Sequence, residues 1–338
     1  MPTPEQRAGS VAAGVAAGDK RAVAAALNLI EDRRPQRQAA IEALLAQLAE
    51  RPKMQRIGLT GPPGVGKSTL AAALARELRT RQRSVGVLAV DPSSTRSGGA
   101  LLGDRARMSF DPEDTGLFVR SLATAGDTGG LAYAAHAVVT VLSAAYDCVL
   151  VETTGVGQTE TDIEHVVDTI CLVVQPGSGD VLQFIKAGIM EIPDILVVNK
   201  ADHGILAQRA AADLAGALEA LRGVGVQGGS EGWRVPVVST SARDHRGIDD
   251  LCDQLDAHRM AAPAEAQRAR RLAGEVHWSL NLLQRRHGEY AIERLGGRAE
   301  VARRASEAIA GGRAPLSVAA ELARAYLMAM GESPTAGA

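Results

Sequence analysis

The segment 61–68 constrains the fold of this chain more than any other feature. It reads Gly61-Pro-Pro-Gly-Val-Gly-Lys-Ser68 and fits GxxxxGK[ST], between a strand predicted at 55–60 and a helix predicted at 67–81. Backbone N–H groups of such a loop point at phosphate oxygens, the lysine reaches the β- and γ-phosphates, and the serine hydroxyl reaches Mg²⁺. The pattern predicts a phosphate-binding loop (P-loop) made of Gly61, Pro62, Pro63, Gly64, Val65, Gly66, Lys67, Ser68 and Thr69.

Short apolar segments typical of buried strands recur after the P-loop, with helical patterns between them. Such an alternation predicts a mostly parallel sheet with helices on both faces, so the expected fold is an α/β P-loop NTPase. Strands are predicted at 84–90, 117–120, 147–152, 169–175, 195–199 and 235–239, and helices around 130–145, 181–190, 205–222 and 247–259.

A base-reading motif, Asn199-Lys-Ala-Asp202, follows the strand predicted at 195–199. The Asp202 carboxylate can accept hydrogen bonds from N1–H and N2–H₂ of guanine. Adenine lacks this pair of donors, so a buried carboxylate would disfavour ATP. A second loop, Ser241-Ala242-Arg243, resembles one that closes over guanine through its backbone. GTP or GDP is therefore the expected nucleotide, with Asn199, Lys200, Asp202, Ser241, Ala242 and Arg243 around the base.

The segment Glu152-Thr-Thr-Gly155-Val-Gly-Gln158 begins at the end of a predicted strand. Its first carboxylate suits Mg²⁺ or a metal-bound water, and the N–H of Gly155 can reach the γ-phosphate. Ras-type GTPases have Asp at the first position and Gln directly after the glycine, whereas this chain has Glu152 and Val156. Because the water-orienting Gln is missing from its usual position, we expect slow intrinsic hydrolysis of GTP. Asp91, also at a strand end beside the P-loop, is in reach of the metal.

The composition excludes several other classes of protein. A hydrophobic content of 46% argues against general disorder, a net charge of −2 against a protein that coats nucleic acid, and 3% aromatic residues against base-stacking platforms. Cys148, Cys171 and Cys252 lie far apart, so neither zinc nor a disulfide framework is expected. With no apolar signal core and no apolar stretch of about 20 residues, we expect a cytoplasmic protein with no membrane partner.

Five stretches resemble the MeaB/MMAA/ArgK family: DPSSTRSGG, GDR, VETTGVGQ, QPGSGDVLQFIKAGIMEI and NKAD. Members are G-protein chaperones of adenosylcobalamin-dependent acyl-CoA mutases. The resemblance spans roughly residues 5–330 and implies GTP hydrolysis coupled to cofactor loading and protection of a partner mutase. An adenosyltransferase is a second expected partner. No DxHxxG cobalamin motif occurs in the chain, so the mutase is expected to be a separate polypeptide.

The resemblance also implies roles for individual residues. Catalytic roles fall to Lys67, Asp91, Asp104, Glu152 and Lys186, metal binding to Ser68, Asp91, Asp104 and Glu152, and nucleotide binding also to Gly155. The segment from Gly177 to Lys186 is implied to be the family's third switch. Within it, Asp180 can cap a helix, and Gln183 and Lys186 fall close to one face of that helix, so we expect these three to be the switch residues. Lysine is scarce, with five residues among 37 basic ones, and two of the five lie in nucleotide motifs. We therefore expect Lys186 to have a specific role as well.

Three regions are predicted: an N-terminal helical extension at 1–53, a P-loop G domain at 54–262, and C-terminal helices at 263–338. In the extension, Asp19 is expected to cap one helix and Pro35 to begin another that reaches Leu48.

The resemblance implies a homodimer whose arm is the region after Pro263. Apolar residues at helical spacing support an interface there, and packing on the same chain is the alternative. These residues are Leu272, Val276, Leu280 and Leu283, together with Trp278 and Tyr290.

Some alternatives stay open at this point. The stretch LATAGDTGG at 122–130 departs from the SPSSGTLGG or SPTSGTLGG form of many members, which suggests a subgroup serving a different mutase. Methylmalonyl-CoA, isobutyryl-CoA, hydroxyisobutyryl-CoA and ethylmalonyl-CoA mutases all remain candidates. A metal-delivery GTPase of the hydrogenase-maturation type is the main alternative function, although its expected His-rich tract is absent. An arginine-transport-linked kinase and a membrane-targeting GTPase are less favoured.

Overall fold

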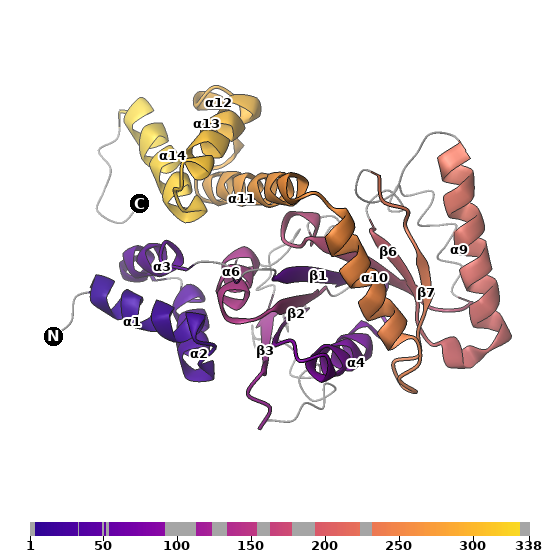
Figure 1. The fold of residues 1–338 in the computed structure, drawn as a ribbon. Coiled ribbons are helices and arrows are strands. Elements are labelled where there is room, and N and C mark those ends of the chain that lie inside the picture. Colours follow the sequence, from indigo (N-terminus) through magenta and orange to yellow (C-terminus); the bar gives the residue numbers. More distant parts are fainter. Residues whose placement is uncertain are drawn as a thin grey trace, which may run out of the picture. The chain divides into compact units, whose positions relative to one another are not determined.

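The structure is a computed structural model (Figure 1), and its elements are coloured along the chain from indigo to yellow. It divides into two compact units, one of Met1–Glu50, His136–Ala145 and Glu265–Ala338, the other of Arg51–Ala135 and Tyr146–Ala264. The structure describes residues 4–32, 34–48, 51, 54–91, 113–123, 134–153, 163–177, 193–223 and 232–331. The helix predicted at 181–190 lies outside these ranges.

The second unit is built on a sheet of seven parallel strands in the order β3-β2-β4-β1-β5-β6-β7. Each predicted strand is present, with ends shifted by at most a few residues, so the α/β P-loop NTPase fold is confirmed. The strands are β1 Gln55–Thr60, β2 Val85–Asp91, β3 Leu117–Ala123, β4 Cys148–Glu152, β5 Thr169–Val174, β6 Ile195–Val198 and β7 Val237–Ser239.

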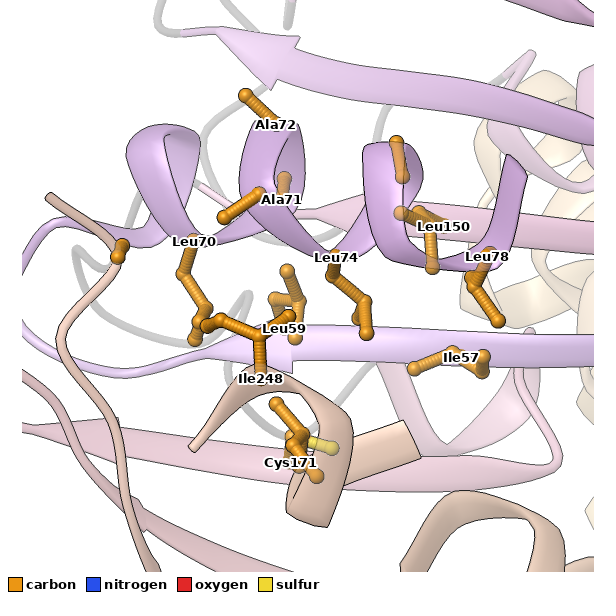
Figure 2. Close-up of a cluster of buried hydrophobic side chains, with 14 of the residues drawn as sticks. Ile57, Leu59, Leu70, Ala71, Ala72, Leu74, Leu78, Leu150, Cys171 and Ile248 are labelled. Carbon is orange, nitrogen blue, oxygen red and sulfur yellow. The ribbon is translucent and has the colours of Figure 1, made fainter. Parts of the chain in front are cut away.

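Helices cover both faces of this sheet, which explains why β4, β5 and β6 are almost continuously apolar rather than alternating. On one face, α4 (Lys67–Thr80) and α10 (Ile248–Ala261) pack on strand residues such as Ile57 and Leu150 (Figure 2). On the other, α9 (Ile205–Gly223) packs on β5 and β6, against the side chains that alternate with those of the first face.

Ile248 and Ile205 provide a matched test of this packing, because each is the first residue of a helix. Ile248 is 2% exposed in the core under α10, whereas Ile205 is 66% exposed on α9. We expect Ile248→Val to lower the free energy of unfolding by about 1 kcal/mol, the usual cost of removing one buried methylene. Ile205→Val should change it by less than about 0.5 kcal/mol. Urea unfolding of both variants measures the difference, and equal losses would contradict this packing.

The first unit contains only helices in the part of the chain that the structure describes. The Asp19 carboxylate caps α2 as predicted, accepting hydrogen bonds from the N–H groups of Arg21 (2.8 Å) and Ala22 (2.9 Å). Pro35 begins a 3₁₀ turn that leads into α3, but the helix ends at Leu45, so the prediction that it reaches Leu48 was wrong. The N-terminal helices are α1 Pro4–Ala16, α2 Lys20–Ile30 and α3 Gln38–Leu45.

The C-terminal helices of this unit bury their apolar residues against one another. Leu280 and Leu283 of α11 lie in a cluster with residues of α12, α13 and α14, and Leu272 and Val276 pack against this cluster. Trp278 stacks on His136 of α6 in the same chain, with ring centroids 4.7 Å apart. Most of the residues expected to form a dimer arm thus already have contacts within their own unit, and Tyr290 is 53% exposed. The elements are α6 Ala135–Ala145, α11 Ala264–His287, α12 Glu289–Arg294, α13 Arg298–Ala310 and α14 Pro315–Ala329.

None of the helices within the described ranges is long and apolar enough to cross a membrane. The three cysteines are buried free thiols of the sheet unit. Burial raises the pKa of the Cys148 and Cys252 thiols to about 12, so both stay protonated and pack as small apolar groups.

Candidate nucleotide site

The P-loop connects β1 to α4 at the carboxyl edge of the sheet. Gly61 has a φ of +138°, and an added Cβ would lie 2.1 Å from the carbonyl oxygen of Val173, so only glycine fits. Gly66 has a φ of +91°, and its Cβ would lie 2.7 Å from the side chain of Asn199. At Gly64, where φ is +81°, no atom lies within 4 Å of an added Cβ. Gly61 and Gly66 thus let the loop pass close to the end of β5 and to Asn199, whereas the turn at Gly64 has free space beside it.

Lys67 is 6% exposed, and its ammonium lies over the P-loop. It donates hydrogen bonds to the carbonyl oxygens of Gly61 (2.7 Å) and Pro62 (2.9 Å). An ammonium carries three donors and no acceptor, and two of the loop's own carbonyls accept from it. The positive charge is therefore already at the loop that the sequence predicts to bind phosphate.

Ser68 and Glu152 form the predicted metal pair that the structure brings together. The Ser68 hydroxyl, in the first turn of α4, donates to Glu152 Oε1 at 2.6 Å. Sheet register explains this, because Glu152 ends β4 level with Leu59 of β1, just before the P-loop. A hydroxyl and a buried carboxylate side by side are oxygen ligands of the kind Mg²⁺ prefers, so these residues fit the metal.

Other predicted site residues are only partly described. Asp91 is the last residue of β2, two positions beyond the residue that pairs with Glu152, so its backbone lies at the same sheet edge. The predictions for Asp104, Gly155, Asp180, Gln183 and Lys186 fall outside the described residues. Within the described ranges, no three His, Cys, Asp or Glu side chains lie together as a metal site.

Asn199 joins the base loop to the P-loop. It is 2% exposed, and its Nδ2 donates to the carbonyl oxygen of Val65 at 2.9 Å. Its Oδ1 accepts from Thr240 Oγ1 (3.2 Å) and from the N–H of Ala242 (3.4 Å). One buried amide thus holds three loops in place. Our motif analysis missed Thr240, although its position directly before Ser241 at a strand end was a usable signal.

Asp202 lies beside the second base loop, as the two motifs predict. Its Oδ1 accepts a hydrogen bond from Ser241 Oγ at 2.9 Å. The carboxylate is exposed in this structure, whereas our sequence argument assumed a buried one. The carboxylate is desolvated only when a base covers it. Discrimination between guanine and adenine therefore arises in the nucleotide complex, where guanine supplies hydrogen bonds to the covered carboxylate and adenine does not.

The Ser241 hydroxyl has a testable electrostatic effect. Its hydrogen bond to Asp202, followed by a local backbone hydrogen bond, lowers the pKa of that carboxyl below its usual value. A lowered pKa keeps the carboxylate ionised as the pH falls, so base binding through Asp202 should persist into acid solution. In Ser241→Ala, the pKa of Asp202 should rise, and guanine-nucleotide affinity should decline at a higher pH than in the wild type. Fluorescent GDP titrations across pH measure this, and superimposable profiles would contradict it.

A P-loop after the first central strand, a base loop after β6 and a buried carboxylate at the end of β4 define the P-loop GTPase class. Residues 23–292 match the family model described as methylmalonyl Co-A mutase-associated GTPase MeaB, and the chain belongs to this family.

Known proteins agree with this assignment. A GTPase of Pyrococcus abyssi is 41% identical over 297 residues, covering 86% of this chain and 89% of the relative. The mitochondrial methylmalonic aciduria type A homolog of Mus musculus is 36% identical over 287 residues, covering 80% of this chain and 68% of the relative. The crystal structure of a LAO/AO transport system kinase has the same fold, with a TM-score of 0.64 and 24% sequence identity, and the match covers 96% of this chain and 99% of that one. The protein is therefore a GTPase that hydrolyses GTP to GDP and phosphate.

Proposed function

We propose that this GTPase couples GTP binding and hydrolysis to cofactor loading and protection of an adenosylcobalamin-dependent acyl-CoA mutase. The match of residues 23–292 to the mutase-associated GTPase family carries this proposal. The match begins in α2 and ends in α12, so it includes helices that precede and follow the G domain in the sequence as well as the nucleotide site. Methylmalonyl-CoA mutase, or a close relative, is the first partner to test, and an adenosyltransferase is the second.

In this function, the nucleotide site works with Mg²⁺. Lys67 binds the β- and γ-phosphates and neutralises charge that moves onto them during hydrolysis. Ser68, Glu152, Asp91 and Asp104 would hold the metal, which would supply Lewis-acid stabilisation of negative charge on the phosphates. Asp202 reads the guanine, and Ser241 orients its carboxylate at 2.9 Å.

The isolated protein hydrolyses GTP slowly, and the mutase accelerates it. Val156 stands where Ras-type enzymes have their water-orienting Gln. Transition-state groups supplied by a partner contribute about 10³–10⁵-fold in other GTPases, so we expect stimulation of at least about tenfold. Phosphate release from GTP, measured with and without the apo-mutase, tests this. The proposal fails if several acyl-CoA mutases of the source organism neither bind the protein nor change its rate.

The segment with Asp180, Gln183 and Lys186 acts as the switch that transmits the nucleotide state to the mutase. Lys186→Ala should bind GTP almost normally but lose most of the stimulation by the mutase. The matched control is Lys20→Ala, which removes a lysine of α2 and should leave the stimulation unchanged. If stimulation survives intact in Lys186→Ala, the coupling lies elsewhere.

The proposed assembly is a homodimer in the cytoplasm. The region after Pro263 is its proposed arm. Because the apolar residues of α11 already pack within their unit, a dimer through this region would use other exposed residues, among them Tyr290 and Met328. Light scattering of the full chain measures the oligomeric state.

A further inference from the structure

Lys200, the second residue of the base-reading motif, has an unusual backbone. Its φ is +61° and its ψ +41°, in the left-handed region that residues other than glycine seldom adopt. Such a conformation persists where surrounding contacts hold it. At Lys200 these contacts include backbone hydrogen bonds of both neighbouring residues, from the N–H of Asn199 to Val174 and from the N–H of Ala201 to Thr240. The side chain adds two more, because its ammonium donates to two oxygens on other loops.

The first of these oxygens is the carbonyl of Gly64 in the P-loop, 2.8 Å from Lys200 Nζ. The second is Oε1 of Gln175, in a short hydrogen bond. An ammonium only donates hydrogen bonds, so the amide oxygen of Gln175 must face it. Hydrogen bonds with a charged donor are stronger than neutral ones, which makes Gln175 a substantial contact of this lysine.

Gln175 lies at the end of β5, next to both the P-loop and the base loop. It directly follows Val174, the last residue of β5, whose carbonyl oxygen accepts the N–H of Asn199 at 2.9 Å. One residue earlier, the carbonyl of Val173 is the atom that excludes a side chain at Gly61. The backbone at the end of β5 therefore lies close to both the P-loop and the base loop. The side chain of Gln175 adds a hydrogen bond to the base loop through Lys200.

We propose that Gln175 is a positioning residue of the guanine-nucleotide site. It holds the Lys200 ammonium over Gly64 and so fixes the base loop relative to the P-loop. No step of hydrolysis requires Gln175 to touch the substrate, and its effect passes through Lys200. The expected consequence is slow release of bound GDP, because release requires the base loop and the P-loop to separate. This inference depends on the GTPase activity and is independent of the proposed mutase partner.

The test uses the full chain loaded with GDP that carries an N-methylanthraniloyl fluorophore. Gln175→Met keeps the length of the side chain but removes the acceptor, and it should speed GDP release about tenfold, as expected for one hydrogen bond to a charged group. Gln175→Glu keeps an acceptor oxygen, so its release should be no faster than that of the wild type. Gln208→Met, at an exposed position on α9, is the matched control and should release GDP at the wild-type rate.

A double-mutant cycle separates positioning from a general structural role. If Gln175 acts through Lys200, then adding Gln175→Met to the variant Lys200→Met should change the release rate by less than about twofold. Thermal unfolding of the nucleotide-free variants reports folding, and Gln175→Asn, which is too short to reach Nζ, replaces Gln175→Met if the latter is unstable. Release from Gln175→Met at the wild-type rate, equal acceleration in Gln175→Glu, or additive effects in the cycle would each overturn the proposal.

Discussion

Asp202→Asn is expected to reverse the base preference of the protein and to weaken GTP binding on the order of 10⁴-fold, the discrimination typical of sites with unpaired polar groups. The carboxylate accepts two hydrogen bonds from guanine, whereas an asparagine amide would turn a donor toward one of the donors of guanine. Xanthine carries a carbonyl where guanine has its amino group, so xanthosine triphosphate should become the preferred ligand.

Equilibrium titrations with fluorescent GTP, xanthosine triphosphate and ATP measure this change. Asp213→Asn is the matched control, because Asp213 is an exposed carboxylate on the neighbouring helix α9. It should leave all three affinities unchanged. Unaltered GTP binding by Asp202→Asn would show that the base is read by other groups.

Asp194→Ala is expected to destabilise the sheet unit by about 2–5 kcal/mol, because it leaves two buried hydrogen-bond partners without their acceptor, at about 1–3 kcal/mol for each. Asp194 is fully buried before β6, and its Oδ1 lies 3.2 Å from Nε2 of His258 on α10. Its Oδ2 accepts the N–H of Ile170 at 2.9 Å. On the other side of the ring, Nδ1 of His258 lies 2.9 Å from Thr169 Oγ1. Removing the carboxylate leaves the buried N–H of Ile170 and Nε2 of His258 without this hydrogen-bond partner.

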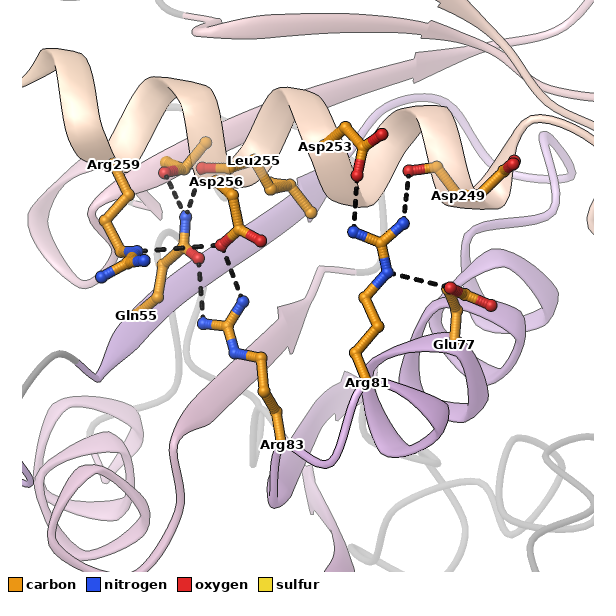
Figure 3. A network of polar contacts seen from close by, with 10 residues as sticks. Gln55, Glu77, Arg81, Arg83, Asp249, Asp253, Leu255, Asp256 and Arg259 are labelled. Atoms are coloured by element: carbon orange, nitrogen blue, oxygen red, sulfur yellow. Dashed lines mark hydrogen bonds and ion pairs between the residues drawn. The ribbon is translucent and has the colours of Figure 1, made fainter.

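Urea unfolding followed by circular dichroism measures this loss. Asp253→Ala is the control, since Asp253 is 66% exposed and pairs with Arg81 across α4 and α10 (Figure 3). Exposed ion pairs contribute about 0–1 kcal/mol, so this variant should remain close to the wild type. A loss in Asp194→Ala no larger than in Asp253→Ala would mean that solvent reaches the buried pair.

Arg81 and Arg83 also illustrate what motif reasoning overlooks. Arg81 pairs with Glu77 of its own helix and with Asp253 of α10, while Arg83 pairs with Asp256 of α10 (Figure 3). These contacts join the end of α4 to a helix more than 160 residues further along the chain. A sequence pattern shows an arginine after a helix, but the identity of a distant partner depends on how the two helices pack.

The sequence by itself determined the sheet and the nucleotide loops. Strand and helix periodicity, the glycine spacing of the P-loop and the Asn199–Asp202 motif are local properties, and local backbone chemistry decides them. The predicted strands accordingly match β1 to β7, and Asp19 caps its helix as expected. The family resemblance rested on the same kind of contiguous motif, and the match to residues 23–292 confirms it.

Only the tertiary structure decided which distant side chains meet. Sheet register places Glu152 against Ser68, and the end of β5 brings Gln175 to Lys200. The pair of Asp194 and His258 depends on α10 packing under the sheet. The apolar residues of α11 show the same limit, because their spacing predicts a buried face but not whether its partner is a second copy or the same unit. Side-chain packing in three dimensions determines the partner, and helical spacing alone carries no information about it.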